Sequence, residues 1–367
     1  MTIFKPCGWS PIALAATLLS GAAVAAPFPG IATPPPVQDD GTITTPSFQL
    51  PYSSFASPEA TASFVKQLRN PFPIVPNIAR MRQLTDDRVA PMLALSRSLY
   101  PYTSTKSVIG GVPVETFTPA AGIAPQNKAR VLIELHGGGF VTGGGGIGGA
   151  IESVPIAGVA RIKVVAVDYR IAPEYRFPAG SEDLAAVYRE LLKTYRPENI
   201  GIFGCSAGGI LAGQAIPWFL KAHLPLPGAV GIFCASLHTF GDGDSAQLWP
   251  RMGSVIPLIP PAKPESFGRA SPYLANASVT DPLALPSASA EVMKAFPPTL
   301  FLTGTRAPEM SGAAQSDLEL RDFGVKSELL LFDGMDHGFL MDPTLPESKR
   351  AYRLIAQFFA ENLGRKR

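Results

Sequence analysis

Residues 200–221 read IGIFGCSAGGILAGQAIPWFLK, and this stretch decides the fold. Its opening Ile-Gly-Ile-Phe is apolar apart from the glycine, which is typical of a short strand buried on both faces. The turn Gly204–Gly209 follows, and the apolar segment from Ala207 to Lys221 predicts a helix. A serine on so tight a strand-to-helix turn needs small residues two positions before and after it, and the turn exposes its hydroxyl. The stretch therefore predicts Ser206 as a nucleophile, although a small-residue turn without chemistry is the alternative.

Working outward from this stretch, short apolar runs alternate with helical patterns. The further apolar runs are 131–135, 164–167, 229–234, 299–303 and 329–332. The helical patterns are 181–195, 207–221, 311–323 and 347–362. Alternation of strands and helices with short connections predicts an α/β fold, in which helices cover both faces of a mostly parallel sheet.

The run at 131–135 leads directly into His136-Gly137-Gly138-Gly139-Phe140. Consecutive glycines leave backbone N–H groups unobstructed, and such groups stabilise the oxyanion that forms when an ester carbonyl is attacked. We predict Gly138 and Gly139 as oxyanion donors, with Ala207 as a third donor at a helix N-terminus. His136 is predicted to hold this loop through ring hydrogen bonds rather than to act as a base.

The chain contains four histidines, at positions 136, 223, 238 and 337. A nucleophile of this kind takes its general base from later in the chain. His337 lies in a glycine-flanked loop between the run at 329–332 and the final helix, so we predict His337 as the base. His238 follows the run at 229–234 and remains possible, whereas His223 lies at the end of a helix.

With these motifs in place, the chain resembles the hormone-sensitive-lipase-like family of α/β hydrolases, the bacterial family IV esterases. The resemblance covers most of the chain after residue 50. It rests on the order and spacing of these motifs: His136–Phe140, Asp168–Glu174, Phe177–Ala179, Asp183, Gly204–Gly209, Asp281–Leu283 and Gly334–Phe339.

The resemblance implies an α/β-hydrolase fold, with an eight-stranded, mostly parallel sheet and an N-terminal helical cap over the site. It implies hydrolysis of short- to medium-chain acyl esters as small-molecule substrates, with no metal and no organic cofactor. It also implies that Arg170 and Glu174 form an ion pair beneath the site.

The acid of the triad is where this sequence departs from the family, which usually carries Asp at the position of Ala307. An acid is needed to orient the imidazole of His337 and to stabilise its charged form. Glu309 lies two residues further along the same loop with a longer side chain, so we predict Glu309 as the acid. The other candidates are a solvated Asp317 and the two neighbours of the histidine, Asp333 and Asp336. A site with no acid is the remaining alternative.

The N-terminal region predicts export. Lys5 precedes the apolar run Ile12–Ala26, which is shorter than the ~20 residues that a membrane span needs. Ala23-Val24-Ala25 fits a cleavage site, with a cut after Ala25 or Ala26. We therefore divide the chain into four parts and expect a periplasmic or secreted product. The parts are a signal peptide at 1–26, a proline-rich linker at 27–50, a helical cap at 51–105 and a catalytic domain at 106–367.

Composition limits the partners. The 31 basic and 29 acidic residues give a net charge of +2, which does not indicate nucleic-acid binding. No basic amphipathic helix indicates membrane docking, and oligomeric state stays open. Cys205 and Cys234 each end a predicted strand, and we expect buried thiols rather than a bridge. Aromatic residues in the predicted cap either line an acyl pocket or pack within the cap; these are Phe55, Phe64, Phe72 and Tyr100.

A second class of function also fits the sequence. Because Ala307 occupies the usual acid position, the chain could be a weakened or non-catalytic protein that binds a ligand in the same pocket. The presence of both Ser206 and His337 favours the hydrolase, since a protein that only binds has no evident need for either side chain.

Overall fold

The computed structural model describes residues 36–45, 47, 49–73, 75–240, 242–253 and 272–365. The predicted signal peptide lies outside these residues, as do residues 27–35, 46 and 48 of the predicted linker. The chain divides into two compact units, Met1–Leu50 and Pro51–Arg367. In the first unit Val37 pairs with Ile43 across a turn. The second unit contains the sheet and all the helices described below.

Eight strands form one sheet in the order β1-β2-β4-β3-β5-β6-β7-β8. Their bounds are β1 Tyr102–Ile109, β2 Val112–Pro119, β3 Val131–Leu135, β4 Lys163–Val167, β5 Ile200–Cys205, β6 Ala229–Phe233, β7 Thr299–Gly304 and β8 Ser327–Phe332. The β1–β2 and β2–β4 pairs are antiparallel, and the other five pairs are parallel. The predicted mostly parallel, eight-stranded sheet is therefore confirmed.

The six apolar runs in the sequence correspond to β3 through β8, whereas β1 and β2 give no such signal. β1 is an edge strand whose residues 103–108 are all exposed, so it has no apolar pattern to detect. β2 alternates buried and exposed positions for its first three residues and then loses the alternation. Only strands that are covered on both faces produce the continuous apolar run.

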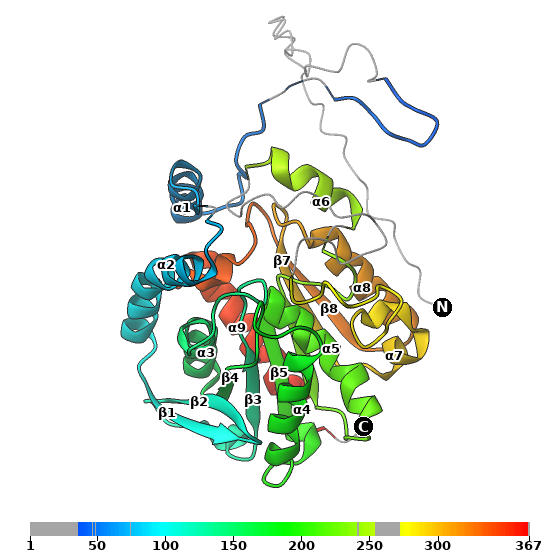
Figure 1. The fold of residues 1–367 in the computed structure, drawn as a ribbon. Helices are drawn as coiled ribbons and strands as arrows, with labels where there is room; N and C mark the ends of the chain where they lie inside the picture. The colour runs from blue at the N-terminus through cyan, green and yellow to red at the C-terminus, as the bar shows by residue number, and fades with distance from the viewer. Residues whose placement is uncertain are drawn as a thin grey trace, which may run out of the picture. The chain divides into compact units, whose positions relative to one another are not determined.

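Helices cover both faces of the sheet (Figure 1). The helices are α1 Pro58–Arg69, α2 Ile78–Leu99, α3 Ile147–Ala160, α4 Ala179–Leu191, α5 Ala207–Lys221, α6 Gly243–Leu248, α7 Ala290–Ala295, α8 Met310–Asp322 and α9 Pro346–Asn362. Side chains on one face of the sheet pack with α4, α5 and α8, and those on the other face pack with α3 and α9. Strand β3 shows the alternation, because Ile133 faces the first group and Leu132 the second.

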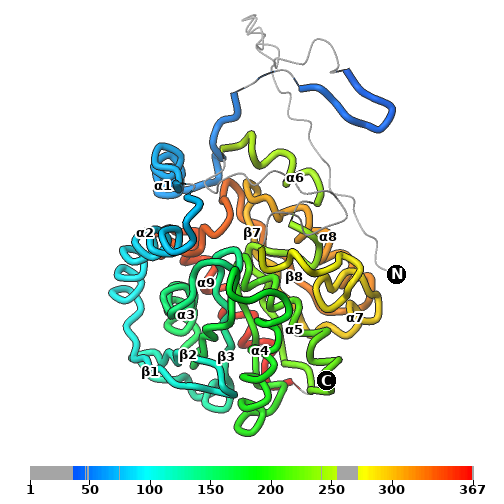
Figure 2. Tube along the Cα trace, in the orientation of Figure 1, coloured from blue at the N-terminus to red at the C-terminus, as the bar shows by residue number. Residues whose placement is uncertain are grey.

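The predicted cap region forms two helices in the same compact unit as the sheet. Ser57 caps α1 by accepting a hydrogen bond from the Ala60 N–H. Helix α2 is 22 residues long and continues through Pro91. A proline removes one intrahelical hydrogen bond, but α2 lies along α3 (Figure 2), and this packing keeps the helix continuous.

Two further expectations can be compared with the structure. Cys205 and Cys234 are both buried and unbridged, as predicted, and burial raises the pKa of the Cys205 thiol well above its usual value. Within the described ranges, no helix has both the length and the apolar character needed to cross a membrane.

Candidate active site

Three loops that are distant in sequence meet at one edge of the sheet. Parallel strands end at the same edge, so the loops after β3, β5 and β8 converge there. The Oγ of Ser206, which follows β5, lies 2.9 Å from Nε2 of His337, which follows β8. The structure therefore brings together the two side chains predicted as nucleophile and base.

The turn that carries Ser206 has the strained backbone that the sequence indicates. Ser206 has φ 59° and ψ −121°, a backbone conformation that residues other than glycine rarely adopt. A Cβ atom at Gly204 or at Gly208 would collide with the carbonyl oxygen of Leu135 in β3. The two glycines therefore permit β3 and the turn to approach closely, and this approach fixes Ser206 at the start of α5.

Glu309 lies next to His337. The Oε2 of Glu309 is 2.9 Å from Nδ1 of His337, and its Oε1 accepts a hydrogen bond of 2.7 Å from the hydroxyl of Thr303. The side chain of Glu309 is fully buried. Ala307 is also buried, and its methyl side chain cannot form a hydrogen bond with His337. The longer glutamate thus reaches the histidine from a position two residues after the usual one, at the start of α8.

The electrostatics of His337 follow from this contact. Burial by itself lowers the pKa of the imidazole, but the adjacent Glu309 carboxylate outweighs burial and raises the pKa of His337 to about 9. Phe240 lies edge-on to the ring at 5.5 Å. The histidine is therefore held on three sides, by a hydroxyl, a carboxylate and an aromatic ring.

The glycine loop after β3 faces the same point. Gly138 and Gly139 have positive φ, at 112° and 62°. In the described part of the chain, their N–H groups donate to no other backbone or side-chain acceptor. Both residues line one cavity together with Ser206, Ala207 and His337. Gly138, Gly139 and Ala207, the three predicted oxyanion donors, therefore line the same cavity as Ser206.

His136 behaves as predicted, since its Nδ1 lies 2.8 Å from the Gly137 oxygen and its ring stacks on Tyr169 at 4.3 Å. His238 lines the cavity, but its Nε2 lies 3.0 Å from Glu319 on α8. Neither ring is hydrogen-bonded to Ser206.

The cavity has a volume of about 1810 Å³, and its wall is largely apolar. Helices α1 and α2 contribute Phe64, Met81, Val89 and Met92, and the segment between these helices contributes Phe72. Of the four aromatic residues considered above, Phe64 and Phe72 line the cavity, Phe55 is exposed and Tyr100 packs on Tyr352 of α9. The N-terminal helices therefore form part of the wall around Ser206.

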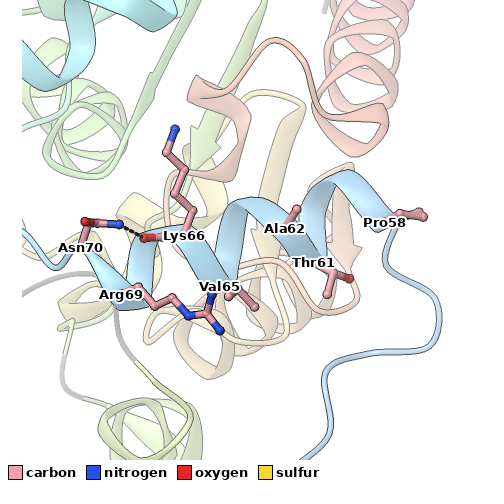
Figure 3. A pocket seen from close by; sticks show the side chains of 7 residues that line it. All are labelled: Pro58, Thr61, Ala62, Val65, Lys66, Arg69 and Asn70. Carbon is pink, nitrogen blue, oxygen red and sulfur yellow. Dashed lines mark hydrogen bonds between the residues drawn. The ribbon is translucent and has the colours of Figure 1, made fainter.

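A second hollow runs along α1 (Figure 3). It is lined by Pro58, Thr61, Ala62, Val65, Lys66, Arg69 and Asn70. Its charged groups are Lys66 and Arg69, and none of its seven residues pairs a nucleophile with a base. This hollow therefore has no counterpart to the contact between Ser206 and His337 in the larger cavity.

Two sequence-based expectations about charged residues are wrong. Arg170 does not pair with Glu174; it pairs with Asp183 at 2.9 Å and Glu182 at 3.0 Å on α4. Glu174 instead pairs with Arg82 of α2 at 2.7 Å. The loop after β4 contacts both α4 and α2. Arg170 therefore meets the carboxylates of α4, whereas Glu174 meets Arg82 of α2.

The second error concerns Asp317, which was expected to be solvated. It is buried on α8 and bonded to Arg321 one turn further along the same helix. The partner of this carboxylate is thus an arginine on the same helix and not His337.

Sequence reasoning missed four side chains around the site. They are Thr303, Phe240 and a pair of buried glutamates, Glu134 and Glu152. Thr303 and Glu134 lie in mainly apolar strands. Their polarity was the only feature of the sequence that could have indicated a role at the site. Glu152 lies in the helix α3, which the sequence did not predict.

Comparison with known proteins supports this picture. The profile of the α/β hydrolase fold family matches residues 132–341. The carboxylesterase/phospholipase LipF of Mycobacterium tuberculosis is 29% identical over 242 residues, which cover 65% of this chain and 64% of that protein. This chain thus spans slightly less than two thirds of that relative.

Solved structures give longer matches. The structure of an esterase named E25 superimposes with a TM-score of 0.73 at 26% identity, covering 88% of this chain and 99% of that one. An esterase from the bacterial hormone-sensitive lipase family superimposes with a TM-score of 0.70 at 26% identity, covering 84% of this chain and 99% of that one.

Proposed function

Because the chain belongs to the α/β hydrolase fold family, in its hormone-sensitive-lipase-like branch, we propose that it is a carboxylic-ester hydrolase. The observation that carries this proposal is the continuous hydrogen-bonded row from Glu309 through His337 to Ser206. Gly138, Gly139 and Ala207 line the same cavity, which supports their backbone N–H groups as the proposed oxyanion donors.

The proposed reaction proceeds through an acyl-enzyme. The Oγ of Ser206 attacks the acyl carbon while Nε2 of His337 takes its proton, and the resulting oxyanion accepts hydrogen bonds from the three N–H groups. The tetrahedral intermediate collapses, and His337 gives the proton to the departing alcohol. A water molecule then attacks the acyl group by the same route, which releases the acid and restores Ser206. Glu309 keeps the ring of His337 oriented and stabilises its charged form.

We propose small-molecule esters with short or medium acyl chains as substrates, since the wall of the cavity is mainly apolar side chains with few charges. Labelling with a fluorophosphonate probe tests the proposal. Wild-type protein should be labelled at Ser206 and should hydrolyse p-nitrophenyl esters, whereas Ser206→Ala should do neither. A wild-type protein that binds esters without labelling or turnover would instead support the ligand-binding alternative.

We also propose that the protein is exported, as the N-terminal residues indicate. N-terminal sequencing of the product from the cell envelope or the medium should begin at Ala26 or Pro27. Recovery of uncleaved chain from the cytosol would contradict this proposal.

A further inference from the structure

A buried glutamate lies directly beneath the two loops that surround the proposed reaction centre. Glu152 projects from α3 and is only 4% exposed. Its Oε1 accepts the N–H of Gly137, and its Oε2 accepts the N–H of Cys205, each at 2.9 Å. Gly137 immediately precedes the two predicted oxyanion donors, and Cys205 immediately precedes Ser206. One carboxylate thus joins the glycine loop to the turn that carries the nucleophile.

The two segments are also in close contact at this point. A Cβ atom at Gly137 would lie 3.0 Å from the Cys205 carbonyl oxygen, 3.2 Å from Oε1 of Glu152 and 3.5 Å from Cβ of Ser206. The position of the glycine loop therefore responds directly to any shift of the Glu152 carboxylate. Because N–H donors must be aimed at the developing charge, such shifts are expected to affect turnover.

A second buried carboxyl supports the first. Glu134 on β3 is fully buried, and neither of its oxygens receives a hydrogen bond from an N–H or O–H group in the described chain. Burial, together with the neighbouring Glu152 carboxyl, raises the pKa of Glu134 well above its usual value. Burial also raises the pKa of Glu152, to about 8, but the N–H bonds from Gly137 and Cys205 act in the opposite direction. Glu134 is thus the carboxyl that keeps a proton, and it can donate that proton to Glu152.

The packing makes room for this pair. A Cβ atom at Gly149, one turn before Glu152 in α3, would lie 2.8 Å from Cβ of Ala166 and 3.0 Å from Oε2 of Glu134. The missing side chain lets α3 approach the sheet closely enough for the two glutamates to meet.

We propose that Glu152 is a positioning residue. It fixes the position of the glycine loop relative to the turn that carries Ser206, and Glu134 is its hydrogen-bond donor. The inference rests on the proposed ester hydrolysis. Glu152 acts through Gly137 and Cys205 and contacts no substrate, so its effect should appear in kcat and not in KM.

The test compares two substitutions that each replace a carboxyl group with an amide of the same length. In Glu152→Gln, the amide NH₂ cannot accept a hydrogen bond, so one of the two backbone N–H groups loses its acceptor. We expect kcat for a p-nitrophenyl ester and the rate of fluorophosphonate labelling to fall ~10–100-fold, with KM nearly unchanged. In Glu134→Gln, the amide still donates to Glu152, so kcat should stay within about threefold of wild type.

A matched control separates positioning from stability. Thr299 is fully buried at the start of β7, far along the strand from the site, and its hydroxyl donates to the Pro297 oxygen. Thr299→Val should lower the midpoint of thermal unfolding without lowering kcat. Should Glu152→Gln fail to fold, Glu152→Asp replaces it, because the shorter carboxylate reaches only one of the two N–H groups and should also lower kcat, by about tenfold.

Either of two results would overturn the inference: a folded Glu152 variant with wild-type kcat, or equal losses in Glu134→Gln and Glu152→Gln. These failures differ from failure of the proposed function, in which the wild-type protein itself would neither hydrolyse esters nor react with the probe.

Discussion

The floor of the cavity and its helical wall are built in different ways. On the floor, Ser206, His337 and Glu309 are joined by two hydrogen bonds, and the acid is completely buried. The helical part of the wall is formed by α1 and α2, which expose apolar side chains such as Leu95 and Leu99. The difference suggests that the floor governs whether an ester is cleaved, and that the wall governs which esters enter.

The wall is attached to the floor through a few polar contacts. Arg82 of α2 donates to the carbonyl oxygens of Val141 and Ala172 and pairs with Glu174. Arg306, from the loop that carries Glu309, donates to the Pro51 oxygen and lies over the rings of Tyr52 and Phe64. Changes in the wall should therefore alter substrate range and stability more than they alter chemistry.

The largest effect is expected at the floor, from removing the charge of the acid. Glu309→Gln should lower kcat on the order of 10⁴-fold, because the imidazole loses the group that orients it and stabilises its charged form. Asp317→Asn serves as the matched control, since that carboxylate bonds to Arg321 on the same helix and not to His337. Steady-state kinetics with a p-nitrophenyl ester measure both, and equal losses would remove Glu309 from the proposed mechanism.

The pH profile should give the next largest effect. His337 can accept the serine proton only when it is neutral, and the Glu309 carboxylate holds its pKa at about 9 against the effect of burial. We therefore expect kcat/KM to rise with pH toward a plateau above about pH 9, by roughly tenfold per unit below the midpoint. In Glu309→Gln the midpoint should move to lower pH, because the charge that raises the pKa is gone. A profile of the same midpoint in both proteins would show that Glu309 does not control this histidine.

A change in the wall should act on substrate range. Phe72 lines the cavity, whereas Phe55 is 87% exposed and lies outside it. Phe72→Ala should raise KM for a hexanoate ester by about tenfold through lost apolar contact, with little change for the acetate ester. Phe55→Ala should leave both values unchanged. A fall in kcat for both esters would show that Phe72 affects the chemical step, and would contradict the separation of roles between floor and wall.

The smallest effect is expected from loosening the wall. Arg82→Met removes the hydrogen bonds that tie α2 to the glycine loop, and should destabilise the protein by about 1–2 kcal/mol. Thermal unfolding measures this loss, with kcat staying within a few-fold of wild type. Arg80→Met is the control, because Arg80 is exposed on the same helix. A loss of kcat comparable to that of Glu309→Gln would show that wall and floor act as one unit.

The sequence by itself determined strands β3 to β8 of the sheet and the position of Ser206. Both depend on local conformation: buried strands need continuous apolar runs, and the nucleophile turn needs Gly204 and Gly208 where backbones touch. His337 could be singled out because chain order and its place after the last strand leave few alternatives. These features depend on residues that are adjacent in the sequence, so they can be predicted without knowledge of the tertiary packing.

Only the tertiary structure decided which charged groups meet. The contact of Glu309 with His337, the pairing of Arg170 with Asp183 and the burial of Glu152 beneath Gly137 all join segments far apart in sequence. A carboxylate has several possible partners at similar sequence separation. Which partner it contacts depends on how helices α3, α4 and α8 pack on the sheet. Local patterns specify backbone conformation, whereas the partners of buried charges are set by the packing of the whole domain.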